Sequence, residues 1–204
     1  MSPASPSRKK RSLAKPALDG CRVAILVADG FEQDELTSSR IALEQAGGET
    51  EIVSPSVTRV RGWNHGEWGG DSEVDVPLDS ADPEDYDALL LPDGVMNLDE
   101  LRGNAGAMEF VMSFIQAGKP VAAIGHGPSA LVNSGALRGR TLTSRETIKE
   151  DLANAGAHWT DAEVVTDRGL ITSRRPEDLP AFNHEFIEQL SGKSKRSVQS
   201  GKSK

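Results

Sequence analysis

Gly125, His126 and Gly127 form a turn whose setting favours nucleophilic chemistry. The apolar run 121–124 precedes them and predicts a buried parallel strand, while Pro128 follows and favours the start of a helix. The sequence therefore predicts a strand–turn–helix elbow, where backbone N–H groups and the helix dipole favour negative charge. A thiolate would be stabilised at such an elbow, and an oxyanion would find hydrogen-bond donors there.

The residue at the elbow, however, is Gly125, which has no side chain that could attack a substrate. Cys21 and Ser129 are the two candidate substitutes. Cys21 begins the first predicted strand, and Ser129 lies inside the predicted elbow helix, so we expect both to have structural roles. The chain thus predicts a site built to present a nucleophile that it lacks.

The elements that must position this turn alternate between apolar strands and amphipathic helices. Such alternation predicts a mostly parallel sheet covered on both faces by helices. Core positions are expected at helical spacing, at Leu36, Ile41 and Leu43, at Phe110, Phe114 and Ile115, and at Phe182 and Phe186. The predicted strands are 22–28, 49–54, 86–91, 121–124, 140–143 and a hairpin over 163–173; the predicted helices are 31–46, 97–102, 105–117, 128–135, 147–155 and 176–190.

A glycine-rich segment between residues 57 and 77 breaks this alternation and predicts a small antiparallel excursion. Trp63 and Trp68 lie within it, and they are expected either to form an interface or lid or to pack on the sheet edge. His65 stands alone in this segment, so we expect it to have a surface or structural role.

Length and composition indicate one α/β domain between two basic tails. The chain has 204 residues, of which 37% are hydrophobic. Ten of its 23 lysines and arginines lie in residues 1–18 and 191–204, which contain no acid, so 13 bases face 31 acids in the domain 19–190. Both tails are expected to be disordered. The acidic domain argues against a specific nucleic-acid partner.

Cysteine usage and hydropathy suggest the compartment. One cysteine excludes an intrachain disulfide and fits a reducing cytoplasm. No apolar run is long enough to span a membrane, and no apolar core follows the basic N-terminal residues as in a secretory signal. We therefore expect a cytoplasmic protein with no membrane partner.

Four ordered blocks resemble the PfpI-type family of intracellular proteases, glyoxalases and protein deglycases, within the class I glutamine amidotransferase-like superfamily. The blocks are residues 31–36, 87–94, 118–128 and 137–144, and residues 151–157 and 159–165 fit as well. The similarity covers residues 21–190, and the segment 63–70 resembles the stress-protein branch. This resemblance implies a flavodoxin-like three-layer sandwich and a homodimer or higher homo-oligomer.

The resemblance also implies a cysteine at the elbow, an adjacent histidine and an acid after the first strand that hydrogen-bonds the thiol. In this sequence the cysteine position falls on Gly125, the histidine on His126 and the acid on Glu32. An acid supplied across a subunit interface in some members would fall on Asp99, where the alignment needs a gap. We expect a cysteine at position 125 to fit sterically, and the glycine to relieve strain in the elbow.

The resemblance places the oxyanion donors on the backbone of Gly94 and His126. The family's Pro-Gly-Gly reads Pro92-Asp93-Gly94 here. Asp93 would put a negative charge where an oxyanion develops, which opposes catalysis.

Three functions from different classes follow. The first is a stress-associated protein with impaired or absent activity, which keeps its pocket for a small carbonyl compound, a peptide or a glycated protein. The second is an active hydrolase or glyoxalase that uses Glu32 and His126 as an acid–base pair without a thiol. The third is an ordinary enzyme in which Gly125 is an engineered replacement.

Glu32 and His126 also have structural alternatives: Glu32 could cap the first helix, and His126 could stabilise the turn. No metal or other cofactor is expected, because Glu32 and His126 alone provide too few ligands.

Overall fold

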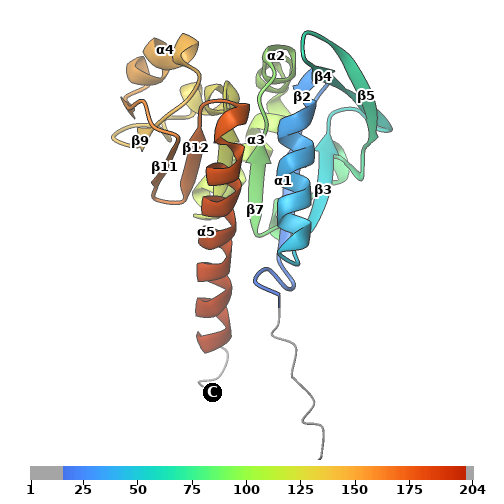
Figure 1. Ribbon diagram of the computed structural model, residues 1–204, viewed down its shortest axis with the longest axis vertical. Helices are drawn as coiled ribbons and strands as arrows, with labels where there is room; N and C mark the ends of the chain where they lie inside the picture. The colour runs from blue at the N-terminus through green and yellow to red at the C-terminus, as the bar shows by residue number, and fades with distance from the viewer. Residues whose placement is uncertain (1–15, 201–204) are drawn as a thin grey trace, which may run out of the picture.

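A seven-stranded sheet forms the centre of the molecule (Figure 1). The computed structural model describes residues 16–200, with side chains described up to residue 192. All neighbouring strands are parallel except the first pair, so the mostly parallel sheet is confirmed. In spatial order the strands are β11 (Val164–Asp167), β12 (Leu170–Ser173), β8 (Val121–Ile124), β7 (Ala88–Leu91), β1 (Arg22–Leu26), β3 (Glu49–Ser54) and β6 (Val76–Pro77).

Helices cover both faces of this sheet and complete a three-layer α/β sandwich. On one face α1 and α5 lie side by side, as Figure 1 shows in blue and red, and bury Leu43, Phe182 and Phe186. On the other face α2 and α3 bury Leu101, Phe114 and their neighbours. The α-helices are α1 (Gln33–Gln45), α2 (Val95–Gly103), α3 (Ala105–Gln116), α4 (Lys149–Asn154) and α5 (Leu179–Ser200); the 3₁₀ helices are η1 (Leu78–Ser80), η2 (Pro83–Asp85), η3 (Gly127–Ser134), η4 (Glu146–Ile148) and η5 (Pro176–Asp178).

The order of the strands determines where the site lies. β8, β7 and β1 are neighbours in the centre of the sheet, and every residue of β7 and β8 is buried. Because parallel strands end at the same edge, the loops that follow β1, β7 and β8 meet there. These loops carry the positions singled out in the sequence.

Two smaller sheets flank the central one. The predicted antiparallel excursion is confirmed as the hairpin of β4 (Arg59–Asn64) and β5 (Glu67–Glu73), and β2 (Phe31–Glu32) pairs with β4. Trp63 and Trp68 pack edge to face across the hairpin, with ring centroids 5.5 Å apart. β9 (Thr141–Leu142) pairs with β10 (His158–Trp159) in a two-stranded parallel sheet.

The predicted elbow helix is present as the 3₁₀ helix η3, with Pro128 in its first turn as expected. One predicted core position, Ile41, is wrong. Ile41 is 49% exposed on α1, because the buried face of that helix follows Leu36 and Leu43.

The predicted domain limits also need correction. Leu18 is fully buried, and its backbone N–H bonds to the Ala46 carbonyl, so the folded unit begins before residue 19. α5 continues to Ser200, beyond the predicted domain limit at residue 190. Residues 1–15 and 201–204, the remainder of both predicted tails, lie outside the described residues. Within residues 16–200, no helix combines the length and apolarity needed to cross a bilayer.

Candidate active site

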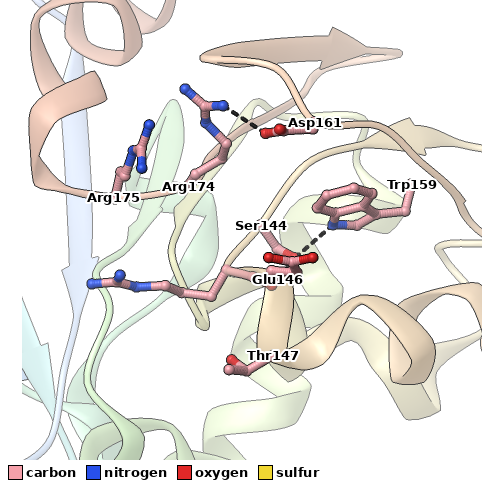
Figure 2. Close-up of a pocket in the computed structure, with 8 residues that line it drawn as sticks. Ser144, Glu146, Thr147, Trp159, Asp161, Arg174 and Arg175 are labelled. Carbon is pink, nitrogen blue, oxygen red and sulfur yellow. Dashed lines mark hydrogen bonds and ion pairs between the residues drawn. The ribbon is translucent and has the colours of Figure 1, made fainter.

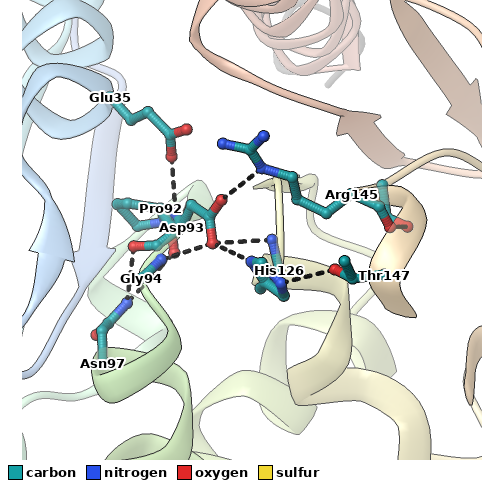
Figure 3. A network of polar contacts seen from close by, with 9 residues as sticks. Glu35, Pro92, Asp93, Gly94, Asn97, His126, Arg145 and Thr147 are labelled. Carbon is teal, nitrogen blue, oxygen red and sulfur yellow. Dashed lines mark hydrogen bonds and ion pairs between the residues drawn. The ribbon is translucent and has the colours of Figure 1, made fainter. Parts of the chain in front are cut away.

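Asp93 occupies the centre of the site (Figure 3). Its side chain follows β7, is almost completely buried, and directs Oδ1 at two backbone N–H groups. Gly94 N–H donates to Oδ1 over 2.6 Å, and His126 N–H donates over 3.0 Å. These are the two donors that the resemblance assigns to an oxyanion. The carboxylate of Asp93 therefore already occupies the cradle that would bind one.

The second oxygen of Asp93 fills the space that a side chain at position 125 would need. A Cβ added at Gly125 would overlap Asp93 Oδ2 and would lie 2.8 Å from Asp93 Cβ. The expectation that a cysteine would fit at position 125 is therefore wrong, and Asp93 is the reason. Gly125 also has a φ of 63°, in the left-handed region that favours glycine. Gly125 and Asp93 are thus complementary in shape.

His126 is held at both ring nitrogens. Its Nδ1 lies 2.8 Å from Asp93 Oδ1, and its Nε2 lies 3.0 Å from the Thr147 hydroxyl. Burial would raise the pKa of Asp93, but hydrogen bonds from His126 and Gly94 outweigh it and lower that pKa, so the carboxylate is ionised. An ionised carboxylate only accepts, which places a proton on Nδ1; in the neutral ring, Nε2 then accepts from Thr147. The polar partners of the ring are thus Asp93 and Thr147.

Arg145 adds a positive charge beside the carboxylate. Its Nε lies 3.5 Å from Asp93 Oδ2, and its backbone N–H bonds to the Gly125 carbonyl over 3.0 Å. Arg145 therefore closes the polar network over the elbow from the loop that follows β9.

Glu32 lies next to this network. The ring nitrogens of His126 bond to Asp93 and Thr147, and not to the Glu32 carboxyl. Its backbone N–H donates to the Asp93 carbonyl over 3.0 Å. Burial and the neighbouring charge of Asp93 raise the pKa of its half-buried carboxyl. Glu32 stands at the N-cap position of α1, but its side chain makes no capping hydrogen bond. The helix-capping alternative is therefore wrong.

Glu35 is a site residue that the sequence analysis missed. Only 1% of it is exposed, and its Oε2 accepts the Asp93 N–H over 2.8 Å, while Oε1 has no hydrogen-bond partner. Burial, followed by the charge of Asp93, raises the pKa of this carboxyl well above its ordinary range. The available signal was its position directly before Leu36, on the buried face of α1.

Glu35→Gln is expected to stabilise the protein progressively as the pH rises above 4.5, the ordinary pKa of the carboxyl. The unfolded chain ionises near this value, whereas the folded protein keeps the proton to higher pH. The natural protein therefore loses stability as the pH rises through this interval, and glutamine removes the loss while its oxygen still accepts the Asp93 N–H. Urea denaturation of both proteins from about pH 4 to about pH 8 measures the difference. A difference that is constant with pH would contradict the expectation.

The side chains of the other candidates take no part in the Asp93 network as the structure describes it. Cys21 is at the amino end of β1, opposite the elbow, and burial raises the pKa of its thiol to about 12, so it is a poor nucleophile. Ser129 is buried in η3. Asp99, on α2, lines a separate cavity of about 420 Å³ that also reaches His126. His65 is exposed in the β4–β5 turn, 3.3 Å from Asp34.

Comparison with known proteins identifies the fold family. Residues 21–189 match the DJ-1/PfpI family. The chain belongs to the DJ-1/PfpI family. An uncharacterised protein of Staphylococcus haemolyticus is 43% identical to it over 171 residues, which cover 83% of this chain and 97% of the relative. An uncharacterised protein of Staphylococcus aureus is 42% identical over 83% of this chain and 98% of its own length.

Solved structures of other DJ-1/PfpI proteins share this architecture. DJ-1β of Drosophila melanogaster superposes with a TM-score of 0.76 at 26% identity, over 89% of this chain and 96% of that one. A two-domain protein of Anabaena variabilis with DJ-1/ThiJ/PfpI-like and ferritin-like domains gives a TM-score of 0.78 at 33% identity. That match covers 83% of this chain and 48% of the two-domain protein. The resemblance stated from the sequence, and its flavodoxin-like sandwich, are confirmed.

Proposed function

We propose that this protein is a DJ-1/PfpI family member that lacks the thiol-dependent hydrolase, glyoxalase and deglycase chemistry which the sequence resemblance implies. In this proposal Gly125 stands at the nucleophile position, and Glu32 and His126 remain from the acid–base machinery. Thiol-dependent turnover is absent because no attacking atom is present and the oxyanion donors are already engaged.

One observation carries this proposal: a single carboxylate, that of Asp93, takes the place of two functional groups. Oδ1 accepts both expected oxyanion donors, and Oδ2 occupies the volume that a side chain at position 125 would need. The two departures from the family pattern, Gly125 and Asp93, therefore fit each other. This complementarity argues against Gly125 as an isolated engineered replacement, because a cysteine there would overlap Asp93.

The thiol-free enzyme remains the second candidate, and it needs Glu32 and His126 to act together. Against it, the ring nitrogens of His126 bond to Asp93 and Thr147. In favour of it, the raised pKa of Glu32 is typical of a carboxyl that can carry a proton at the operating pH. The two candidates therefore need a direct test.

Within the proposal, the protein is a cytoplasmic, stress-associated homodimer or higher homo-oligomer. Its ligand is a small carbonyl compound, a peptide or a glycated protein, bound without turnover. In such an assembly Asp99 is the residue nearest to the acid that some family members supply across a subunit interface, at a point where the alignment needs a gap.

Methylglyoxal consumption by four proteins tests the proposal: the natural chain, Gly125→Cys, Asp93→Gly and the double variant. We expect turnover from the double variant alone, because only this variant has a thiol and also frees the Gly94 and His126 N–H groups. Its rate should exceed that of the natural chain by about 10²-fold or more, the scale of covalent and oxyanion contributions.

Glu32→Gln in the natural background is the control that separates the two candidates. Turnover by the natural chain that Glu32→Gln abolishes would establish the thiol-free enzyme and overturn the proposal. Circular dichroism of each variant checks that an inactive protein is folded.

A further inference from the structure

A second cavity, of about 470 Å³, opens beside the Asp93 network (Figure 2). Its walls come from the β9–η4 segment, from β10 and from the loop that joins β12 to η5. Trp159 forms one wall, and its indole N–H donates to the Ser144 hydroxyl over 3.0 Å. The cavity is large enough for a small organic molecule.

Positive charge is concentrated around this cavity in a domain that is otherwise strongly acidic. Residues 16–192 contain 13 lysines and arginines against 31 acids. Three of those bases, Arg145, Arg174 and Arg175, line this one cavity. A fourth, Lys149, lies over the Trp159 ring, 4.8 Å from its centroid. Such a concentration favours an anionic occupant.

The three arginines are not equivalent. Arg174 is already engaged at all three of its guanidinium nitrogens, because Nε and Nη2 bond to the buried carboxylate of Asp178 and Nη1 bonds to Asp161. It therefore holds the loop and also neutralises Asp161, one of the two acids in the cavity wall. Figure 2 shows Arg174 turned to Asp161, while Arg175 has no dashed contact to the residues drawn.

Arg145 and Arg175 keep capacity for another anion. The Arg175 side chain is 52% exposed, and its ion pair with Glu177 is long, at 3.8 Å. The Arg145 side chain is 42% exposed and reaches Asp93 only through Nε, at 3.5 Å. Each guanidinium has five N–H donors in a planar fork that matches carboxylate and phosphate oxygens.

We propose that this cavity binds a small molecule bearing a carboxylate or phosphate group, with the anionic group on Arg145 and Arg175 and the remainder against Trp159. Glu146 is the remaining acid in the wall and opposes the bound charge. The selectivity is for anions that accept paired hydrogen bonds, because guanidinium forks bind such groups bidentately.

Arg145 couples this cavity to the Asp93 network. An anion that draws Arg145 toward the cavity competes with Asp93 Oδ2 for the same guanidinium. We therefore expect Asp93→Asn to tighten binding several-fold, because it removes both the competitor and a nearby negative charge. Binding itself does not depend on whether the elbow is catalytically silent.

Isothermal titration calorimetry with inorganic phosphate and with citrate tests the proposal, and tryptophan fluorescence, to which Trp159 contributes, gives a second readout. Tighter binding of phosphate assigns the phosphate class, and tighter binding of citrate assigns the carboxylate class. We expect Arg175→Gln to weaken the preferred anion about tenfold, the scale of one charge-assisted contact. Arg59→Gln is the matched control, because Arg59 is 62% exposed with an equally long ion pair at 3.9 Å, far from the cavity in the β4–β5 hairpin.

Glu146→Gln should change the affinity for the anion in the opposite direction to Arg175→Gln. Glu150→Gln, on α4, is its control. Removal of Glu146 should tighten binding more than removal of Glu150, which does not line the cavity. The absence of saturable binding by either anion, or equal losses in Arg175→Gln and Arg59→Gln, would overturn the proposal. These titrations contain no methylglyoxal, so their failure is separate from failure of the proposed function.

Discussion

Gly125→Cys by itself is expected to lower the free energy of unfolding by about 3–5 kcal/mol, the cost of disrupting a buried, paired charge. The new Cβ would overlap the Asp93 carboxylate, which would have to leave the N–H groups of Gly94 and His126. The left-handed φ of residue 125 adds to the cost. For a chain of this size the melting temperature should fall by roughly 10 °C.

The companion experiment is a double-mutant cycle with Asp93→Gly. Asp93→Gly alone is destabilising, because it leaves the buried donors and the His126 ring without their acceptor. In the double variant the cysteine enters space that Asp93 has vacated, so its loss should be smaller than the sum of the single losses by about 2 kcal/mol. Additive losses in urea denaturation would show that the two positions do not interact.

Among substitutions that add a single methyl group in the site, we expect Gly94→Ala to destabilise the protein most. A Cβ there would overlap the Gly30 carbonyl oxygen and would lie 2.8 Å from Phe31 Cα. Both are backbone atoms, so no side chain can rotate to make room, and the φ of 125° is itself unfavourable for alanine. Overpacking and strain together should cost about 4 kcal/mol.

Gly103→Ala is the matched control on the same helix, α2. A Cβ at Gly103 meets nothing within 4 Å, so this change should be neutral or stabilising, by up to about 1 kcal/mol. Urea midpoints measure both variants. Equal midpoints for Gly94→Ala and the natural protein would contradict the close approach of the β1 and β7 loops.

Such close approach also explains how Asp93 and Gly125 fit each other. Asp93 and Gly125 follow the ends of the neighbouring strands β7 and β8, so a change at one alters the space available at the other. The side chain of Asp93 is accommodated because Gly125 has no Cβ. The charge is accommodated because His126, Gly94 and Arg145 all donate toward it.

The sequence by itself determined the architecture and the place of the site. Apolar runs such as 121–124 and the helical spacing of Phe182 and Phe186 are local patterns, and each predicts one buried strand or one buried helix face. Parallel strands connected by helices end at one edge, so the loops holding Glu32, Asp93 and His126 could be expected to meet.

Only the tertiary structure decided what these residues do to one another. From the sequence, Asp93 is a charge near the two expected oxyanion donors. In the structure its carboxylate accepts the N–H groups of Gly94 and His126 and excludes a side chain at Gly125, 32 positions away. The burial of Glu35 and the reach of Arg145 toward Asp93 depend likewise on side-chain directions across separate loops. Hydrophobic periodicity indicates which face of an element is buried, but it does not indicate which atoms come into contact when two loops pack together.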